Sequence, residues 1–195
     1  MIELNDDFLF SQGSKRKCFQ HPSELHMCIK ICLKEGECSS TAHEAKYYRM
    51  LKRRKPNLDY LGLPKFYGYK DTNLGKGGVF ELVRDEDTQE VSRTLYDYKE
   101  IGEIAKDPQF WEKALAEFRT WVKKNSIVAN FHHDNICAKR LADGSVRLIA
   151  IDGIGHGEFI PVSDYLPFMA RRKLERYFKR NNLDSVENLL ANASI

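Results

Sequence analysis

The alternation of hydrophobic and polar residues divides the chain into two parts of different character. Before about residue 100, short apolar alternating runs predict β-strands around a single helix at 41–54, and the strand segments are 8–13, 17–22, 26–33, 63–69 and 77–83. After it, the pattern predicts a helix at 108–124, two short strands at 136–141 and 146–152, and a C-terminal helix. Strands first and helices later predict an α+β protein with two lobes.

The starts of two helices carry capping signals. Thr41 and Glu44 have the spacing of a capping box, and Asp107 precedes a proline at the first helical position of the second helix. An apolar stripe that recurs at helical spacing predicts that this second helix packs against a core, and it consists of Trp111, Leu115, Phe118 and Val122.

Composition excludes several classes of protein. Lys and Arg number 31 against 28 Asp and Glu, so the net charge of +3 gives no case for nucleic-acid binding. No apolar run approaches the ~20 residues of a membrane span, and the acidic N-terminus does not have the pattern of a signal peptide. We therefore expect a cytoplasmic protein.

Five cysteines are an odd number, which indicates reduced thiols rather than a disulfide framework. Cys28, Cys32 and Cys38 do not have the spacing of a zinc knuckle, so a zinc site is not expected from them.

The strand at 26–33 places a lysine among apolar neighbours. Lys30 is expected to alternate onto the same face as Cys28 and Cys32, and an ammonium in such a strand needs an anion or a carboxylate nearby. Glu44, in the first turn of the next helix, could form an ion pair with Lys30. The alternatives are an edge-strand lysine that reaches solvent and a glutamate that only caps its helix.

The strands at 136–141 and 146–152 each place an oxygen donor at one end. Asn135 opens the first strand and Asp152 closes the second, and the turn at Asp143 and Gly144 would bring the two side by side. Oxygen ligands of this kind suit Mg²⁺. The alternative for Asp152 is a residue that caps the following turn.

The loop before Asn135 has the spacing of a kinase-like phosphotransferase with one residue changed. Five positions before Asn135, where such enzymes place a catalytic Asp, the chain has Asn130. A different alignment would nominate His132, His133 or Asp134 as the base. These residues and His156 are also candidate metal ligands, and solvated loop histidines are the favoured interpretation.

Several short motifs together resemble the YrbL family, a bacterial group with a protein-kinase-like fold that is associated by name with the PhoP regulatory network. The motifs are GxxxKCF from Gly13, CIKI, HEAKYYRML, the NSIV and DNIC loop, and IDGIG. The resemblance implies a bilobal fold with an N-lobe at about 1–85 and a C-lobe at about 86–195, with nucleotide bound in the cleft. It implies the following contacts: Gly13 at the glycine turn, Lys30 on phosphate held by Glu44, Cys28 beside adenine, a hinge near Glu81 and Val83, and Asn135 and Asp152 on magnesium.

The resulting hypothesis is a YrbL-like regulatory protein that binds ATP and Mg²⁺, with phosphotransfer to an unidentified acceptor. The alternative is a catalytically inactive pseudokinase that acts through a protein partner. About forty residues follow Gly155, which leaves little room for a peptide-binding lobe and disfavours a protein-substrate kinase. The segment 163–182 is basic and amphipathic; it could contact RNA, an acidic partner or a membrane, but a core-packed helix with a solvated face is favoured.

Overall fold

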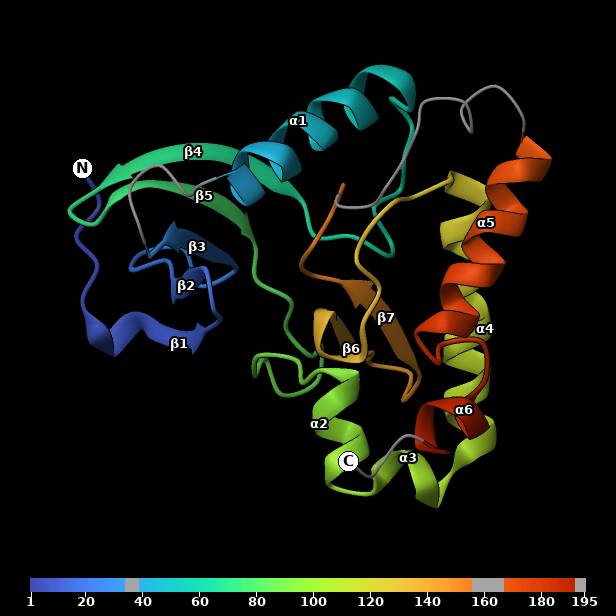
Figure 1. The fold of residues 1–195 in the computed structure, drawn as a ribbon. Helices are drawn as coiled ribbons and strands as arrows, with labels where there is room; N and C mark the ends of the chain where they lie inside the picture. The colour runs from blue at the N-terminus through green and yellow to red at the C-terminus, as the bar shows by residue number, and fades with distance from the viewer. Residues whose placement is uncertain (34–38, 156–166, 192–195) are drawn as a thin grey trace. The chain divides into compact units, whose positions relative to one another are not determined.

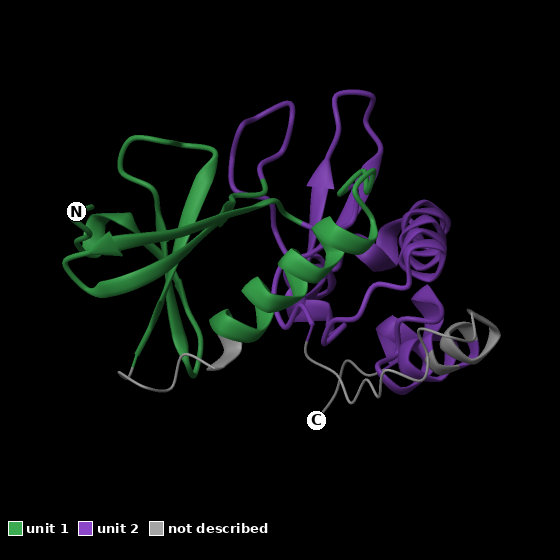
Figure 2. Cartoon of the chain, turned by 90° about the horizontal axis from the view of Figure 1, so that it is seen from above, with its two compact units in different colours: residues 1–60, 64–83 green, residues 61–63, 84–195 purple. Residues whose placement is uncertain are grey.

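The computed structural model describes residues 1–33, 39–155 and 167–191, whose elements are labelled in Figure 1. The chain divides into two compact units (Figure 2). Unit 1 comprises residues 1–60 and 64–83, and unit 2 comprises residues 61–63 and 84–195. The protein is therefore of the mixed α+β class that the sequence predicts, with an antiparallel sheet and several helices.

Unit 1 is built on a five-stranded antiparallel sheet. Its strands are β1 (Leu9–Gln12), β2 (Arg16–Gln20), β3 (Met27–Cys32), β4 (Phe66–Thr72) and β5 (Gly75–Glu81), in the order β1-β2-β3-β5-β4, and the 3-10 helix η1 (Asp6–Phe8) precedes them. Each of them overlaps a predicted strand segment. One cluster of buried apolar side chains consists of Leu4, Phe19, Ile29, Ile31 and Val79.

Unit 1 also contains the helix α1 (Ser39–Arg54), which has one buried face. Tyr48 is buried on it, donates a hydrogen bond to the carbonyl oxygen of Pro64 at 2.7 Å, and packs against Phe66 and Phe80. The capping-box prediction was wrong, because the helix begins at Ser39 and Thr41 lies inside it. The side chains of Thr41 and Glu44 interact instead with the sheet, as described below.

Unit 2 combines helices with a two-stranded antiparallel hairpin. The elements are α2 (Leu95–Glu100), α3 (Glu103–Lys106), α4 (Pro108–Asn125), η2 (His133–Asn135), β6 (Ile136–Arg140), β7 (Val146–Ala150), α5 (Pro167–Arg180) and α6 (Val186–Ala191). The predicted start of α4 is confirmed, because Asp107 accepts a hydrogen bond from the Phe110 amide. The predicted apolar stripe of α4 is confirmed as well, since all four of its residues are buried.

The basic helix α5 is packed against the core on one face. Leu174 and Phe178 are buried, and Phe178 stacks on Phe131, whereas the described basic side chains of the helix, Arg172, Arg176, Lys179 and Arg180, are exposed. This confirms the core-packed helix with a solvated face for the described part. The side chains of Leu166, Met169, Arg171 and Lys173 lie outside the described residues.

The thiols only partly match the expectation. Cys18, Cys28 and Cys137 are free, but Cys32 is disulfide-bonded, so the prediction of reduced thiols throughout was wrong.

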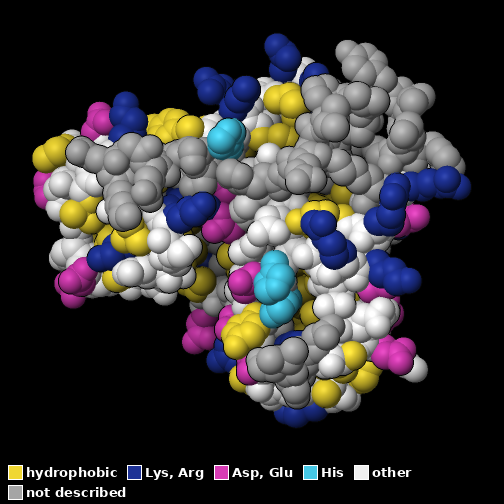
Figure 3. All heavy atoms as spheres, viewed as in Figure 1, with side chains coloured by type: hydrophobic (Ala, Val, Ile, Leu, Met, Phe, Trp, Pro, Cys, Tyr) yellow, Lys and Arg dark blue, Asp and Glu magenta, His cyan; other side chains and the backbone are white. Residues whose placement is uncertain are grey.

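Basic and acidic side chains are interspersed over the face shown in Figure 3, consistent with the small net charge. Over the described part of the chain, no helix is both long and apolar enough to cross a membrane.

Candidate functional site

Unit 1 contains a buried cluster of three charged side chains from three different elements. Arg16 on β2, Lys30 on β3 and Glu44 on α1 expose 7%, 6% and 0% of their surface. Arg16 donates to both carboxylate oxygens of Glu44, at 2.7 and 3.2 Å, and the Nζ of Lys30 lies 3.9 Å from Oε2. The structure therefore brings Lys30 and Glu44 together, with Arg16 as the closer cation.

Sheet register explains why these side chains meet. Arg16 is opposite Cys32 and Cys18 is opposite Lys30, so Arg16 and Lys30 are diagonal neighbours on one face of the sheet. On the other side of β3, Lys30 is opposite Gly78, where an added Cβ would lie 2.8 Å from the Cγ2 atom of Thr41. The missing side chain lets α1 approach the sheet closely enough for Glu44 to reach both cations.

Arg16 is the member of this cluster that sequence reasoning missed. Its guanidinium also donates to the hydroxyl of Thr41 at 3.3 Å, which accounts for a polar residue inside the first turn of α1. The sequence does contain a signal for it. Side chains alternate between the two faces along β2, and the pairing of β2 with β3 puts Arg16, rather than Lys17, on the face of Lys30. Using that signal required the register between the two strands.

The other predicted site positions in unit 1 are Gly13, Cys28, Glu81 and Val83. Gly13 is in the β1–β2 turn, where its amide donates to the carbonyl oxygen of Arg16, and an added Cβ would meet only ordinary contact at 3.9 Å. Cys28 is buried, which raises the pKa of its thiol to about 12, and its sulfur lies 3.9 Å from the carbonyl oxygen of Glu81. Glu81 accepts a hydrogen bond from the Lys65 amide at 3.0 Å, and Val83, which is buried, is the last residue of unit 1.

In unit 2, the hairpin places Asn135 and Asp152 at adjoining strand ends. Ile136 is opposite Ala150, and the amide of Ile151 donates to the carbonyl oxygen of Asn135 at 2.8 Å. One oxygen of Asp152 accepts from the Gly153 amide at 2.7 Å. The side-chain nitrogen of Asn135 donates a hydrogen bond to the carbonyl oxygen of Asn130. The side-chain oxygen of Asn135 is the atom that would bind a cation. An amide oxygen and a carboxylate fit Mg²⁺, which takes few protein ligands.

Asn130 is held by contacts on both its backbone and its side chain. Its amide donates to the carbonyl oxygen of Gly153 at 3.0 Å, and its Oδ1 accepts from the hydroxyl of Tyr177 at 2.9 Å. Gly153 has φ +65°, and a Cβ there would lie 2.6 Å from the Cβ of Asn130. The two segments approach this closely only because residue 153 is glycine. Tyr177, on α5, is a second residue that sequence reasoning missed. Its hydrogen bond to Asn130 joins positions 47 residues apart, and no local sequence pattern predicts such a contact.

The histidines of the loop form their own group. The Nδ1 atom of His132 lies 2.7 Å from Oδ1 of Asp134, with both side chains about half exposed. His133 stacks on Tyr96, and burial together with the neighbouring His132 lowers its pKa. In the described ranges, no three His, Cys, Asp or Glu side chains gather into a group that could hold a metal ion. His156 lies outside the described residues.

Comparison with known proteins identifies relatives along nearly the whole chain. The family model described as PhoP regulatory network protein YrbL matches residues 2–183. A protein of Escherichia coli (strain K12) called "Uncharacterized protein YrbL" is 30% identical over 183 residues, which cover 92% of this chain and 86% of that protein. A protein of the same description from Shigella flexneri matches with the same identity and coverage.

Proposed function

Because the chain belongs to the family of PhoP regulatory network protein YrbL, we propose that it is a regulatory protein of protein-kinase-like, two-lobed architecture that binds ATP and Mg²⁺. In this proposal, Lys30 binds phosphate, and Asn135 and Asp152 hold the metal ion.

The buried pairing of Lys30 with Glu44 is the observation that carries the proposal. A kinase-like nucleotide site needs a strand lysine for phosphate charge and a helix glutamate that positions it. Lys30 on β3 and Glu44 on α1 lie 3.9 Å apart and are almost completely buried. Burial of charge is costly unless it is compensated, and Glu44 is a carboxylate placed to compensate the buried Lys30.

The metal side of the proposal rests on Asn135 and Asp152. These residues would hold Mg²⁺ through an amide oxygen and a carboxylate, and the ion, when bound, would neutralise charge on the nucleotide phosphates. The hydrogen bond from the Asn135 side chain to the Asn130 carbonyl fixes which of its atoms is available to the ion. One carboxylate oxygen of Asp152 accepts a hydrogen bond from the Gly153 amide at 2.7 Å.

A pseudokinase is a second candidate, and one observation favours it. The side chain of Asn130, at the position of the expected base, is engaged with the hydroxyl of Tyr177, and an amide cannot accept a proton at neutral pH. Phosphoryl transfer depends largely on positioning and charge stabilisation, so weak turnover remains compatible with this residue. The two candidates share nucleotide binding and differ in turnover.

Thermal unfolding with ATP and MgCl₂ tests nucleotide binding. A ligand at 100 times its dissociation constant stabilises the folded protein by ~2.7 kcal/mol, which for a chain of this size raises Tm by about 5 to 10 °C. We expect Lys30→Met and Asp152→Asn to abolish the rise. Lys76→Met removes an exposed lysine from the same unit, and we expect it to retain the rise. No rise for the unmodified protein at millimolar ATP would refute the nucleotide proposal.

Turnover separates the two candidates. ATP hydrolysis that disappears in Asp152→Asn would support the phosphotransferase, and tight binding without hydrolysis would support the pseudokinase. Adding ADP in place of ATP then shows whether the terminal phosphate contributes to binding.

A further inference from the structure

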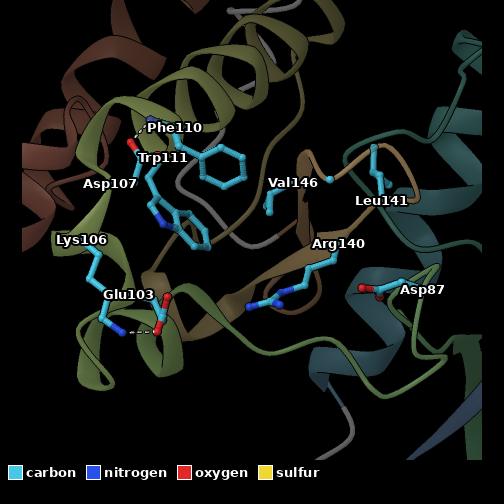
Figure 4. Close-up of a pocket in the computed structure, with 10 residues that line it drawn as sticks. Asp87, Glu103, Lys106, Asp107, Phe110, Trp111, Arg140, Leu141 and Val146 are labelled. Carbon is cyan, nitrogen blue, oxygen red and sulfur yellow. Dashed lines mark hydrogen bonds and ion pairs between the residues drawn. The ribbon is translucent and has the colours of Figure 1, made fainter.

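Unit 2 has a hollow of about 330 Å³ between α3, the start of α4 and the β6–β7 hairpin. Phe110, Trp111, Leu141 and Val146 line it with apolar surface (Figure 4). Arg140, at the end of β6, extends its guanidinium toward the same space (Figure 4). The hollow therefore combines apolar side chains with the guanidinium of Arg140. None of the residues proposed to bind nucleotide or metal lines it.

The guanidinium of Arg140 is held in place before any ligand arrives. Its Nε donates to the hydroxyl of the buried Tyr98 at 2.9 Å, with the guanidinium carbon 5.4 Å from the centroid of that ring. The backbone of Arg140 is fixed as well, since its amide donates to Asp85 at 2.9 Å and its carbonyl oxygen accepts from Glu86 at 2.9 Å. Within the described residues, neither terminal nitrogen of Arg140 makes a hydrogen bond. These two nitrogens are the donors with which an arginine forms a bidentate hydrogen-bonded pair with a carboxylate.

The carboxylates around the hollow already have partners. Glu103 forms an ion pair with Lys106 at 2.6 Å, and Asp107 accepts the capping bond from Phe110. Asp87 accepts from the amide of Thr88 at 2.8 Å. The hollow consequently offers one place for an acidic group, at Arg140, and surrounds that place with carboxylates that would repel a second one.

The exposure of the rim indicates the size of the occupant. Asp87, Lys106, Asp107, Arg140 and Gly144 are all exposed, so the hollow is open to solvent along its edge. Sites for free small molecules enclose most of their ligand, and an open hollow of this volume covers only one large side chain and its neighbour. Side-chain anchors of this kind, beside an arginine and a tryptophan, are typical of protein interfaces.

We propose that this hollow is a docking site for an extended segment of a protein partner, which places an aromatic or branched apolar side chain against Trp111 and Val146 and an adjacent acidic side chain on Arg140. The site is separate from the proposed nucleotide-binding residues and does not depend on them. It selects a segment with a single acidic residue next to the apolar anchor, because the rim carboxylates oppose further negative charge.

The two tryptophans of the chain allow a site-specific test. Both lie on α4, and Trp121 is ten residues from Trp111, about 15 Å along the helix, so it serves as an internal control. The probe is the capped peptide acetyl-Gly-Glu-Phe-Gly-amide, titrated into ¹⁵N-labelled protein while the indole N–H signals are followed by NMR. We expect the Trp111 signal to shift and the Trp121 signal to stay.

Matched peptides and variants identify the recognised groups. Replacing Glu by Gln in the peptide should weaken binding about fivefold, the effect of an exposed ion pair of ~1 kcal/mol. Arg140→Gln should remove that difference, and Lys113→Gln, an exposed lysine on α4 outside the hollow, should retain it. A thermal melt of each variant checks folding, and the peptide comparison on the unmodified protein stands even if Arg140→Gln fails to fold.

Three results would overturn the proposal. One is the absence of a Trp111 shift at millimolar peptide, and another is equal affinity for the Glu and Gln peptides. The third is binding of phenylacetate alone as tight as the peptide, which would make the hollow a site for small carboxylates instead of a partner segment.

Discussion

The guanidinium of Arg16 holds the carboxylate of Glu44 through two hydrogen bonds of 2.7 and 3.2 Å, across 28 positions of the sequence. Lys30 lies farther from the same carboxylate, at 3.9 Å. Glu44 therefore keeps a compensating charge if Lys30 is exchanged, whereas loss of Arg16 would leave it with the more distant partner.

Exchange of Arg16 should destabilise the protein more than exchange of Lys30. Removal of one partner of a buried ion pair costs about 3 to 5 kcal/mol, so we expect Arg16→Met to lower the free energy of unfolding by about that amount. Lys30→Met should cost less, and Arg16→Lys should restore only part of the loss because an ammonium cannot form the two-pronged contact. Urea denaturation measures all three. An equal cost for Arg16→Met and Lys30→Met would contradict the assignment.

A carboxylate at position 130 should be tolerated by the fold and should increase turnover. The Tyr177 hydroxyl donates to Oδ1 of Asn130, and Asn130→Asp keeps that acceptor. If the chain turns ATP over, a general base at this position should raise the rate by about 10²-fold or more. Steady-state hydrolysis measures the rate, with Asn130→Ala as the control that removes the side chain. A rate unchanged by Asn130→Asp would show that position 130 does not limit catalysis.

Gly153→Ala should destabilise unit 2 through two separable effects. The backbone has φ +65°, which costs a residue with a Cβ about 1 to 2 kcal/mol, and the new Cβ would also clash with Asn130. Gly144→Ala is the matched control, because Gly144 has φ +82° with no atom near its missing Cβ. We expect the free energy of unfolding to fall by more in Gly153→Ala than in Gly144→Ala. Equal losses would mean that the close approach to Asn130 is not maintained in solution.

His21 should make the stability of unit 1 depend on pH below neutrality. Burial lowers the pKa of this histidine from its ordinary value of 6.5, and its Nδ1 accepts hydrogen bonds from the amides of Ser23 and Glu24, which only the neutral ring can do. The folded protein thus binds the proton more weakly than the unfolded chain. The contribution is present above pH 6.5 and is lost as the pH falls below it.

NMR titration of His21 measures this directly. We expect a lower midpoint in the folded protein than in the urea-unfolded chain, and His21→Asn should reduce the decline in stability between about pH 6.5 and 5. An asparagine at this position can accept the same amide bonds without titrating. A midpoint in the folded protein at or above that of the unfolded chain would contradict the prediction.

The sequence predicted the long, periodic elements of this protein because their signals are local. The alternation in β3 and the stripe of α4 repeat over enough residues to identify a strand and a helix. The helices α2 and α3, with six and four residues, are too short for a periodic pattern. The local signal for α2 is the capping box of Thr94 and Asp97, which the prediction missed. The start of α1 was misplaced because Thr41 and Glu44 have the spacing of a cap, while their side chains are engaged by Arg16.

By itself, the sequence determined the α+β class, the pairing of Lys30 with Glu44 as a hypothesis, and the hairpin that joins the strand ends of Asn135 and Asp152. These follow from spacing along the chain and from the periods of helices and strands. Only the tertiary structure decided that Arg16 is the nearer partner of Glu44, that Tyr177 holds Asn130, and that Arg140 faces an apolar hollow. Each of these contacts depends on strand register or on the packing of distant segments, and local sequence does not encode either one.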